Sequence, residues 1–283
     1  MLGAMKKLRG NLFSGGGCWI KAWHGGWFKD WPSCHMQVGA CKQRLGFTLV
    51  EMLVVCGVLG ILAGLVLPVL VKARHYAHLV KCTANLRQFG IATHLYWEDN
   101  RGECFKYIHG QTNYGVIYWF GWIAPGVEGE RDFDRTKGAL YPYLLGTGVE
   151  ICPGLNYAMA QFKLKARGAA YGYGYNLCLS RAPKAPPFLA SNIRRPSQTA
   201  LFADAAQVNT FQWPASIENP MLEEFYYIST NTSEATVHFR HNGRAGVVFS
   251  DGHAERQLPQ PGSVDSRLPG QVVGRLNPAL LVP

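Results

Sequence analysis

The C-terminal half of the chain holds side chains that could do chemistry: Asp204, His241, Asp251 and His253. Carboxylates and imidazoles can ligate a metal ion or work as an acid–base pair. The sequence contains no phosphate-binding loop, no Gly-X-Ser-X-Gly nucleophile motif and no His-Glu-X-X-His zinc motif. Any chemistry would therefore depend on whether the fold brings these residues together.

The turn signals in this region predict that His241 and Asp251 lie apart. Asn242-Gly243 and Asp251-Gly252 flank an alternating apolar run, which is a strong hairpin signal. We predict a three-stranded antiparallel meander over Thr236–Gln257. A strand of roughly eight residues at about 3.3 Å each would hold His241 and Asp251 more than ~20 Å apart. We therefore predict no metal site, with Asp251 as a turn residue and His241 at the end of a strand.

The longest apolar run contains a further acid. Residues 47–71 are apolar except for Thr48 and Glu51, and the run exceeds the roughly 20 residues that cross a bilayer as a helix. A carboxylate there costs about 2.5–3.5 kcal/mol on insertion scales, so it is usually paired or functional. An ordinary secretory signal is shorter and is cut after its apolar core. A plain signal anchor leaves Glu51 unexplained.

The residues around Glu51 carry a family resemblance. Gly46-Phe47-Thr48-Leu49-Val50-Glu51 resembles the processing site of type IV prepilins and type II secretion pseudopilins. The resemblance implies that a membrane prepilin peptidase cuts between Gly46 and Phe47 and N-methylates Phe47. It also implies that Glu51 serves assembly by pairing with the N-terminal amine of a neighbouring subunit. Such a pair is chemically reasonable, because a buried carboxylate needs a cation.

Residues 1–46 are predicted to be a cytoplasmic leader that is removed on maturation. They hold seven Lys/Arg and one Asp, whereas the remaining residues hold 21 Lys/Arg and 17 Asp/Glu. The basic excess therefore lies mostly in the leader, which fits the positive-inside rule and gives no support to nucleic-acid binding. Met36–Gly46 alone would make a short basic leader. Translation from Met36 is favoured over Met1, and both starts stay open.

Beyond the membrane run, the helix is predicted to continue to about Asp99 and to end at Asn100 and Gly102. Apolar residues recur there at spacings of three and four, at Leu79, Cys82, Leu86, Phe89, Thr93 and Tyr96. This spacing indicates one apolar helix face, which we expect to pack on the globular domain. The predicted organisation is a transmembrane and filament-core helix at 47–71, an amphipathic helix at 72–100, a β-rich domain at 101–260 and a C-terminal tail at 261–283.

The β-rich part is predicted from its turn residues and aromatic clusters. Residues 101–235 are rich in Gly, Pro and aromatic side chains, which indicates short strands and loops. Aromatic clusters can bind sugars or nucleobases, but more often they fill a small core, and this is the interpretation we adopt. Thr199–Asp204 is predicted to be a buried strand that ends in an acid.

The C-terminal region carries a second resemblance. His241, nine residues and Asp251-Gly252 are similar to the His-X9-Asp-Gly signature of a large bacterial group of prepilin-processed proteins. Cys152-Pro153, Tyr173–Asn176 and Phe202–Asp204 resemble other landmarks of that group. The resemblance assigns no role to His241, Asp251 or Gly252. Some type II pseudopilins bind calcium in a C-terminal loop, but this chain has no Asp-rich ligand ladder. We therefore expect no cofactor, and calcium stays an open alternative without support from the sequence.

The cysteines allow a disulfide if the globular part lies outside the cytoplasm. Cys104, Cys152 and Cys178 fall in that part. Because sequence cannot fix connectivity, Cys152–Cys178 is only the first pair to test.

These patterns predict an α+β, pilin-like fold in which a long N-terminal helix packs on a small antiparallel sheet. We predict a structural subunit, not an enzyme, of a type II secretion pseudopilus or type IV pilus-like filament, built by head-to-tail contacts that do not close. The expected partners are prepilin peptidase, other filament subunits, copies of the chain itself and an assembly platform. The chain would cross the inner membrane once, with its N-terminus cytoplasmic and its C-terminal domain periplasmic.

Several finer assignments stay open. A secretion pseudopilus, a pilus and a DNA-uptake fibre are not distinguished, nor are major and minor subunits, although Glu51 argues against a tip subunit. The alternative class is a single-pass anchored enzyme or carbohydrate-binding module that uses the same export route. Titratable residues clustered in a deep pocket would favour that alternative.

Overall fold

The computed structural model describes residues 46–112, 114–144, 148–169 and 171–283. Apart from Gly46, the predicted leader lies outside the described residues, as does the proposed start at Met36. The chain divides into two units, Met1–Val54 and Val55–Pro283. The described part of the first unit is the stretch from Gly46 to Val54.

Helix α1 spans Leu49–Asp99, which confirms the predicted helix to within two residues. Within the described part of the chain, α1 is the one helix long and apolar enough to cross a membrane. Its C-terminus closes as a Schellman motif. Arg101 adopts a left-handed conformation with φ 56°, and the N–H of Gly102 donates to the carbonyl of Trp97 at 2.7 Å.

The buried face of α1 begins at Cys82. Described residues of α1 before Cys82 are exposed or half-buried. The buried residues from there on are Cys82, Asn85, Leu86, Phe89, Gly90, Ala92, Thr93 and Trp97. This pattern confirms the predicted apolar face, with Leu79 and Tyr96 half-buried at its two ends.

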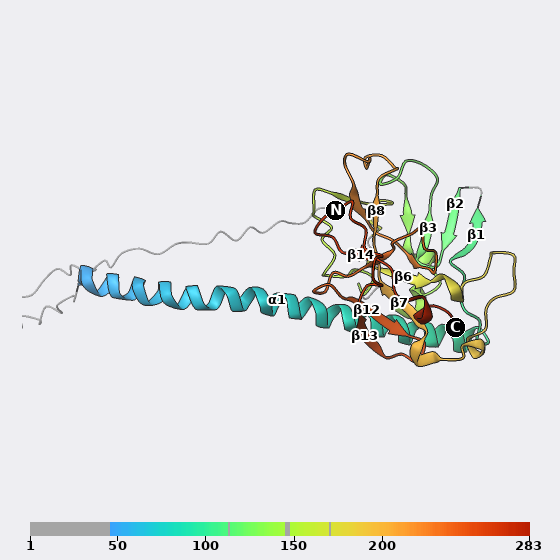
Figure 1. Ribbon diagram of the computed structural model, residues 1–283, viewed down its shortest axis with the longest axis horizontal. Helices are drawn as coiled ribbons and strands as arrows, with labels where there is room; N and C mark the ends of the chain where they lie inside the picture. The colour runs from blue at the N-terminus through green and yellow to red at the C-terminus, as the bar shows by residue number, and fades with distance from the viewer. Residues whose placement is uncertain (1–45, 113, 145–147, 170) are drawn as a thin grey trace, which may run out of the picture. The chain divides into compact units, whose positions relative to one another are not determined.

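The largest sheet of the second unit holds five strands in the order β10-β6-β7-β12-β13. The strands are β10 (Tyr227–Ile228), β6 (Tyr173–Asn176), β7 (Ala200–Asp204), β12 (Ala245–Phe249) and β13 (Ala254–Gln257). Neighbours are antiparallel except for β10 and β6, which are parallel. Figure 1 shows β12 and β13 beside the C-terminal part of α1. Every residue of β7 is buried, which confirms the predicted buried strand.

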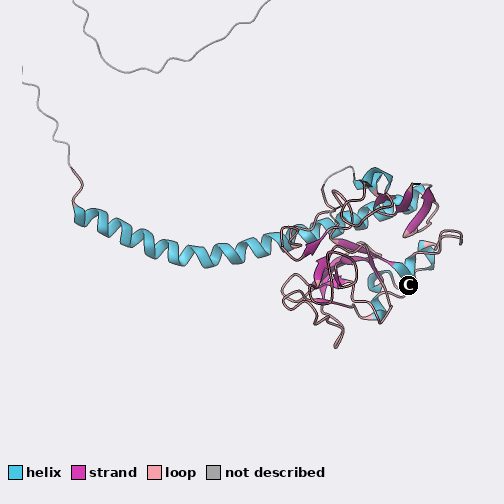
Figure 2. Cartoon of the chain, turned by 90° about the horizontal axis from the view of Figure 1, so that it is seen from above, coloured by secondary structure: helices cyan, strands magenta, loops and turns pink. Residues whose placement is uncertain are grey.

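Three smaller sheets complete the second unit. One is antiparallel and contains β1 (Ile108–Thr112), β2 (Gly115–Tyr118), β3 (Gly121–Ile123) and β4 (Phe133–Asp134). Another contains β5 (Phe162–Lys163), β9 (Met221–Glu223) and β8 (Gln207–Asn209) in that order, and the last pairs β11 (Val237–His238) with β14 (Val273–Gly274). Figure 2 shows that these strands are short and separated by loops.

Short helical turns connect the strands. They are α2 (Tyr141–Leu144) and the 3-10 helices η1 (Arg135–Lys137), η2 (Leu177–Leu179), η3 (Ala190–Asn192), η4 (Pro196–Gln198) and η5 (Pro278–Leu280). With the long N-terminal helix followed by mostly antiparallel sheets, the chain has the predicted α+β, pilin-like fold.

The predicted meander is half correct. Strands β12 and β13 form the expected hairpin across Asp251-Gly252. Asn242-Gly243 also turns as expected, with φ 55° and 71°, but the strand before it does not pair with β12. Strand β11 pairs with β14 instead, because the second edge of β12 is occupied by β7. The prediction that His241 ends a strand of this meander is therefore wrong.

The central strands β6, β7 and β12 are buried on both faces, with α1 covering one face of the sheet. A Cβ added at Gly246 of β12 would lie 2.7 Å from Leu86 Cδ1, and one at Gly90 would lie 3.0 Å from Val248 Cγ2. Glycine at these two positions therefore lets helix and strand approach closely. Aromatic rings fill the core between them, with the Phe89 ring 5.0 Å from that of Phe202 and 5.3 Å from that of Tyr173. This confirms the packing interpretation of the aromatic clusters.

The C-terminal segment 261–283 packs on the second unit. It supplies strand β14, and Leu276 and Leu281 are buried in the core. The Asn176 side-chain amide donates to the carbonyl of Leu281 at 2.9 Å. The predicted tail is thus folded against the β-rich region.

Candidate functional site

The predicted assembly residue Glu51 forms a helix cap with Thr48. Thr48 Oγ1 accepts a hydrogen bond from the backbone N–H of Glu51 at 3.2 Å. The Glu51 carboxylate accepts in return from the backbone N–H of Thr48 at 2.7 Å and from its hydroxyl at 2.9 Å. This reciprocal arrangement is a capping box. Gly46 and Phe47 lie just before the cap, and both are exposed.

The cap places the acid where a helix tolerates it best. Backbone N–H groups at a helix N-terminus favour negative charge, so the Glu51 carboxylate has partial compensation before any other cation arrives. Both bonds go to Glu51 Oε2. The second oxygen is not used by any hydrogen bond among the described residues and remains an acceptor.

A second group of polar side chains lies buried in the second unit. It comprises Cys82 from α1, Cys152 from the loop between α2 and β5, Asp204 from the end of β7, and Arg240 and His241 from the turn between β11 and β12. We call these five residues the Cys–Asp–Arg–His cluster. Three of the landmarks in the second sequence resemblance, at Cys152, Asp204 and His241, therefore meet in space.

Two thiols face each other in the cluster. Cys82 Sγ and Cys152 Sγ are 2.6 Å apart, and the residues are 1% and 0% exposed. A Cβ at Gly172 would lie 2.5 Å from Cys152 Cβ. Glycine at position 172 therefore makes room for the loop that brings Cys152 to the helix.

Asp204 contacts the other polar groups of the cluster. Its Oδ2 accepts from the backbone N–H of Gly246 at 2.6 Å and lies 3.3 Å from His241 Nε2. Its Oδ1 lies 3.6 Å from Arg240 Nε and 3.8 Å from Cys152 Sγ. The fully buried carboxylate thus has a cation, an imidazole and a backbone donor around it, as a buried charge requires.

Arg240 is held by carbonyl oxygens as well as by Asp204. Its guanidinium donates to the carbonyl of Gly172 at 2.6 Å and to that of Ala205 at 3.0 Å. These bonds fix the guanidinium beside Asp204 and Cys152, so its charge acts on both groups.

The pKa values follow from these contacts. Burial raises the pKa of the Cys152 thiol, but the hydrogen bond from Cys82 and the charge of Arg240 outweigh burial and lower this pKa to about 5. The hydrogen bond to Cys152 and burial raise the pKa of Cys82 far above its ordinary value. Burial lowers the pKa of His241, but the hydrogen bonds to Asp204 and Cys152 prevail and raise it to about 9. The reduced cluster therefore holds a Cys152 thiolate beside a protonated His241.

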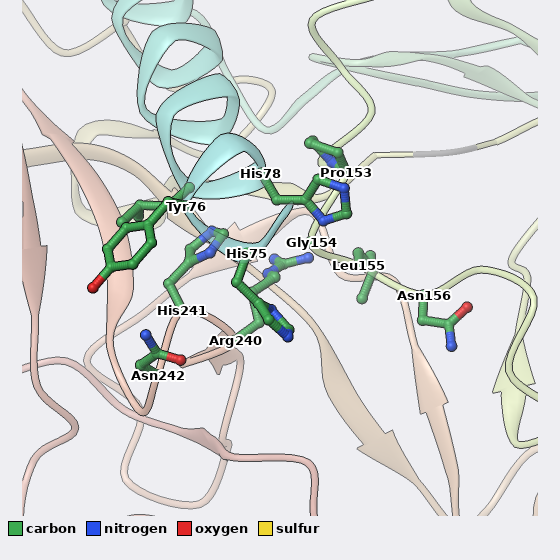
Figure 3. A pocket seen from close by; sticks show the side chains of 11 residues that line it. His75, Tyr76, His78, Pro153, Gly154, Leu155, Asn156, Arg240, His241 and Asn242 are labelled. Carbon is green, nitrogen blue, oxygen red and sulfur yellow. The ribbon is translucent and has the colours of Figure 1, made fainter. Parts of the chain in front are cut away.

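A cavity of about 360 Å³ borders the cluster on the side of His241. Figure 3 shows side chains from three segments around it: His75, Tyr76 and His78 from α1, the loop from Pro153 to Asn156, and the turn from Arg240 to Asn242. Neither cysteine of the cluster lines this cavity. A molecule in the cavity would meet imidazole and guanidinium groups but no thiol.

The cluster has two chemical capacities. Cys82, Cys152 and His241 place one ligand atom each within 4.8 Å of one another, which is the spacing of a metal-ion site with sulfur and nitrogen ligands. A thiolate beside an imidazolium and a carboxylate is also the arrangement of a cysteine nucleophile. The complete burial of Cys152 keeps that sulfur away from substrates.

His241 and Asp251 make separate contacts, as predicted. Asp251 lies after β12 and accepts from the backbone N–H of His253 at 3.1 Å, with the His253 ring 2.6 Å away. This is the expected role of a turn residue. His241 lies before β12 and faces Asp204, so it belongs to the buried cluster.

The structure gives Cys152 a different neighbouring thiol from the predicted Cys178. Cys152 contacts Cys82, whereas Cys178 lies in η2, two residues after Asn176, and is only partly buried. The chain between Cys152 and Cys178 contains β5 and β6, and the two cysteines belong to different clusters of the hydrophobic core.

Sequence reasoning missed Cys82 and Arg240 as members of the cluster. Cys82 had been assigned only to an apolar helix face. The sequence did carry a signal for Cys82: a residue on the apolar face of the helix should point its thiol into the globular part, which also contains Cys152. Arg240 had only its position beside His241 to mark it.

The comparisons with known proteins bear on the N-terminal segment. The family described as the prokaryotic N-terminal methylation motif matches residues 41–67. This match supports a type IV prepilin-like or pseudopilin-like family, and it contains the capping box. No curated protein and no solved structure matches the chain.

Proposed function

We propose that this chain, a type IV pilin-like precursor by its N-terminal methylation motif, is a structural subunit of a type II secretion pseudopilus or type IV pilus-like filament. The observation that carries the proposal is Glu51 at the start of an exposed, membrane-length apolar helix that continues into the globular part. In this proposal residues 1–46 are the leader, 47–71 form the filament core, 72–100 carry the domain, and 101–283 are the β-rich domain with its tail.

Processing would supply the partner that Glu51 needs. Cleavage after Gly46 creates an amine at Phe47, directly before the Thr48 N–H that already bonds Glu51. In a bilayer a carboxylate and an ammonium stabilise each other, because neither has water around it. The free oxygen of Glu51 can accept from the amine of its own chain or of a neighbour. Pairing with a neighbour would link subunits in a membrane-embedded filament core.

The exposed surface of α1 supports packing between copies. The large apolar residues from Phe47 to Val71 are exposed in the isolated chain, and a monomer in water would not leave so large an apolar surface bare. Lipid would cover this surface before assembly, and the helices of other subunits would cover it in the filament. Head-to-tail stacking that does not close produces such a filament.

The enzyme alternative has one observation in its favour and one against it. Titratable residues do cluster beside a cavity, which lies next to His241 and Arg240. The only group of the cluster with nucleophile character is Cys152, and it is fully buried against Cys82. We therefore assign the cluster a structural role in the subunit.

Substitution at Glu51 tests the assembly role. We expect Glu51→Ala to insert into the membrane and to be cleaved normally, but to enter filaments poorly, because the neighbour's amine loses its counter-charge. Glu51→Asp keeps the charge and is the matched control, with partial recovery expected. The readout is the fraction of the chain in sheared filaments relative to the membrane pool. Normal incorporation of Glu51→Ala would contradict the proposed pairing.

Substitution at Gly46 tests the processing step separately. Glycine lacks a side chain and suits a narrow protease site, so Gly46→Leu should leave the chain at its precursor mass. A Gly46→Leu chain that is still cleaved before Phe47 would show that the peptidase does not need glycine there, and a product with another N-terminus would show that another bond is cut.

A further inference from the structure

The buried face of α1 begins with a contact between two thiols, one on the helix and one in the globular part. Cys82 is the first buried residue of α1, and its Sγ lies 2.6 Å from Cys152 Sγ. A covalent S–S bond is about 2.05 Å long, so the two sulfurs need approach by only about half an ångström to bond. No other pair of cysteines makes a sulfur–sulfur contact within the described ranges 46–112, 114–144, 148–169 and 171–283.

We propose that Cys82 and Cys152 form a disulfide that fastens the outer half of α1 to the β-rich domain. The inference rests on the proposed function, because that function places this domain outside the cytoplasm. Disulfides persist in that compartment. The link would close a loop that contains the rest of α1 after Cys82, the sheet β1–β4 and α2.

The geometry favours a disulfide over a metal ion. Tetrahedral zinc bound by two thiolates at about 2.3 Å holds the sulfurs roughly 3.7 Å apart, so these sulfurs would have to separate. The guanidinium of Arg240 is also buried beside Cys152 and Asp204, and a cation in that position opposes a second cation. In the disulfide state Asp204 and Arg240 still neutralise each other, so no buried charge is left without a partner.

The chemistry balances with a disulfide-bearing oxidant of the envelope. The Cys152 thiolate attacks one sulfur of the oxidant, forms a mixed disulfide and releases the oxidant's other sulfur as a thiolate. The Cys82 thiol loses its proton and attacks Cys152 Sγ, which releases the second sulfur of the oxidant. Two protein thiols become one disulfide, and the oxidant's disulfide becomes two thiols. Because both cysteines are buried in the folded domain, the exchange takes place before α1 has docked.

The link would have a mechanical use in a filament. The membrane half of α1 is held among other helices, while the domain is held to α1 by the face that starts at Cys82. A force that pulls the domain away from the filament core would open that face from its membrane-proximal end. A covalent bond at Cys82 would resist separation of α1 from the domain at the point where that separation would begin.

Mass spectrometry of the full chain tests the proposal. The protein is expressed in a bacterium with prepilin peptidase, extracted in detergent under acid quench, unfolded and alkylated with iodoacetamide without reductant. Of the cysteines from Phe47 onward, Cys56, Cys104 and Cys178 should be alkylated and Cys82 and Cys152 should not. Trypsin should then give peptide 82–87 joined to peptide 138–163. Reductant should separate them and expose all five thiols.

The outcomes separate this inference from the proposed function. A chain that begins at Phe47 with all five thiols alkylated overturns the disulfide alone, and so does a link from peptide 138–163 to peptide 168–181, which contains Cys178. Free thiols with one equivalent of zinc by elemental analysis overturn it in favour of a metal site. A chain that keeps residues before Phe47 contradicts the proposed function, whatever the state of its thiols.

Variants and reductant give a second readout. Cys178→Ser should keep the linked peptides, whereas Cys82→Ser should lose them. In the wild-type chain, which needs no variant to fold, reductant should lower the melting temperature of the domain by about 10 °C. An unchanged melting temperature after verified reduction of the link would show that it does not fasten α1.

Discussion

Neutralising Asp204 should be costly, because its carboxylate is fully buried beside Arg240 and His241. Asp204→Asn keeps the size of the side chain but removes its charge, which leaves Arg240 buried without its carboxylate partner. The amide also presents an N–H₂ group either to the Gly246 N–H or to Arg240, both of which are donors. Breaking a buried ion pair by removing one partner costs about 3–5 kcal/mol.

The same exchange at Asp251 is the matched control. Asp251 is also bonded to a histidine, but its side chain is 36% exposed against 0% for Asp204. An exposed pair is worth about 0–1 kcal/mol, so Asp251→Asn should cost little. The comparison holds the chemical change constant and varies only burial and the number of partners.

Thermal unfolding in detergent, followed by tryptophan fluorescence, measures the difference. For a domain of this size 1 kcal/mol shifts the melting temperature by about 2–4 °C. Asp204→Asn should therefore melt about 6–20 °C below the wild-type chain, and Asp251→Asn within about 4 °C of it. Equal melting temperatures for the two variants would refute the central place of Asp204 in the cluster.

Three further predictions follow from other parts of the molecule. Burial raises the pKa of Glu224 to about 7 from 4.5. Because the folded-state pKa is the higher one, the contribution of Glu224 to the free energy of unfolding is complete below pH 4.5 and is lost as the pH rises through 7, by on the order of 3 kcal/mol. The slope of the free energy of unfolding against pH should therefore flatten in Glu224→Gln. A double-mutant cycle on His241→Ala and Asp251→Ala should give a coupling energy near zero, as for separate sites, and a coupling above about 1 kcal/mol would mean that the two share a partner. A chain that begins at Met36 should mature as the full chain does, judged by the mass of the product, and its failure alone would show that residues 1–35 are needed.

Local sequence patterns predicted much of the fold. The run from Phe47 and the three-and-four spacing from Leu79 predicted α1 because a helix repeats its contacts along one stretch of chain. The turn at Asp251-Gly252 predicted the β12–β13 hairpin for the same reason, since the paired residues are close in sequence. The capping box at Thr48 and Glu51 is equally local, although the sequence had suggested only an assembly role for Glu51.

Such local patterns do not predict which strands or side chains pair over long distances in the sequence. Strand β11 has partners on β14 rather than in the adjacent hairpin, and nothing in the alternation of its residues distinguishes the two. Cys82 and Cys152 are 70 residues apart, and the choice of Cys178 followed only from its place in the globular part. The cluster depends on four separate segments reaching one point, which is decided by how α1 packs on the sheet.

The N-terminus of the chain found in filaments is the most direct test of the account. Filaments are sheared from cells, the chain is identified within them, and its intact mass is measured. The account predicts a chain that begins at Phe47 and carries a methyl group on its new amine, recovered together with other pilin-like subunits or with copies of itself. Recovery of the chain only from membranes, or with any N-terminus other than methylated Phe47, would contradict it.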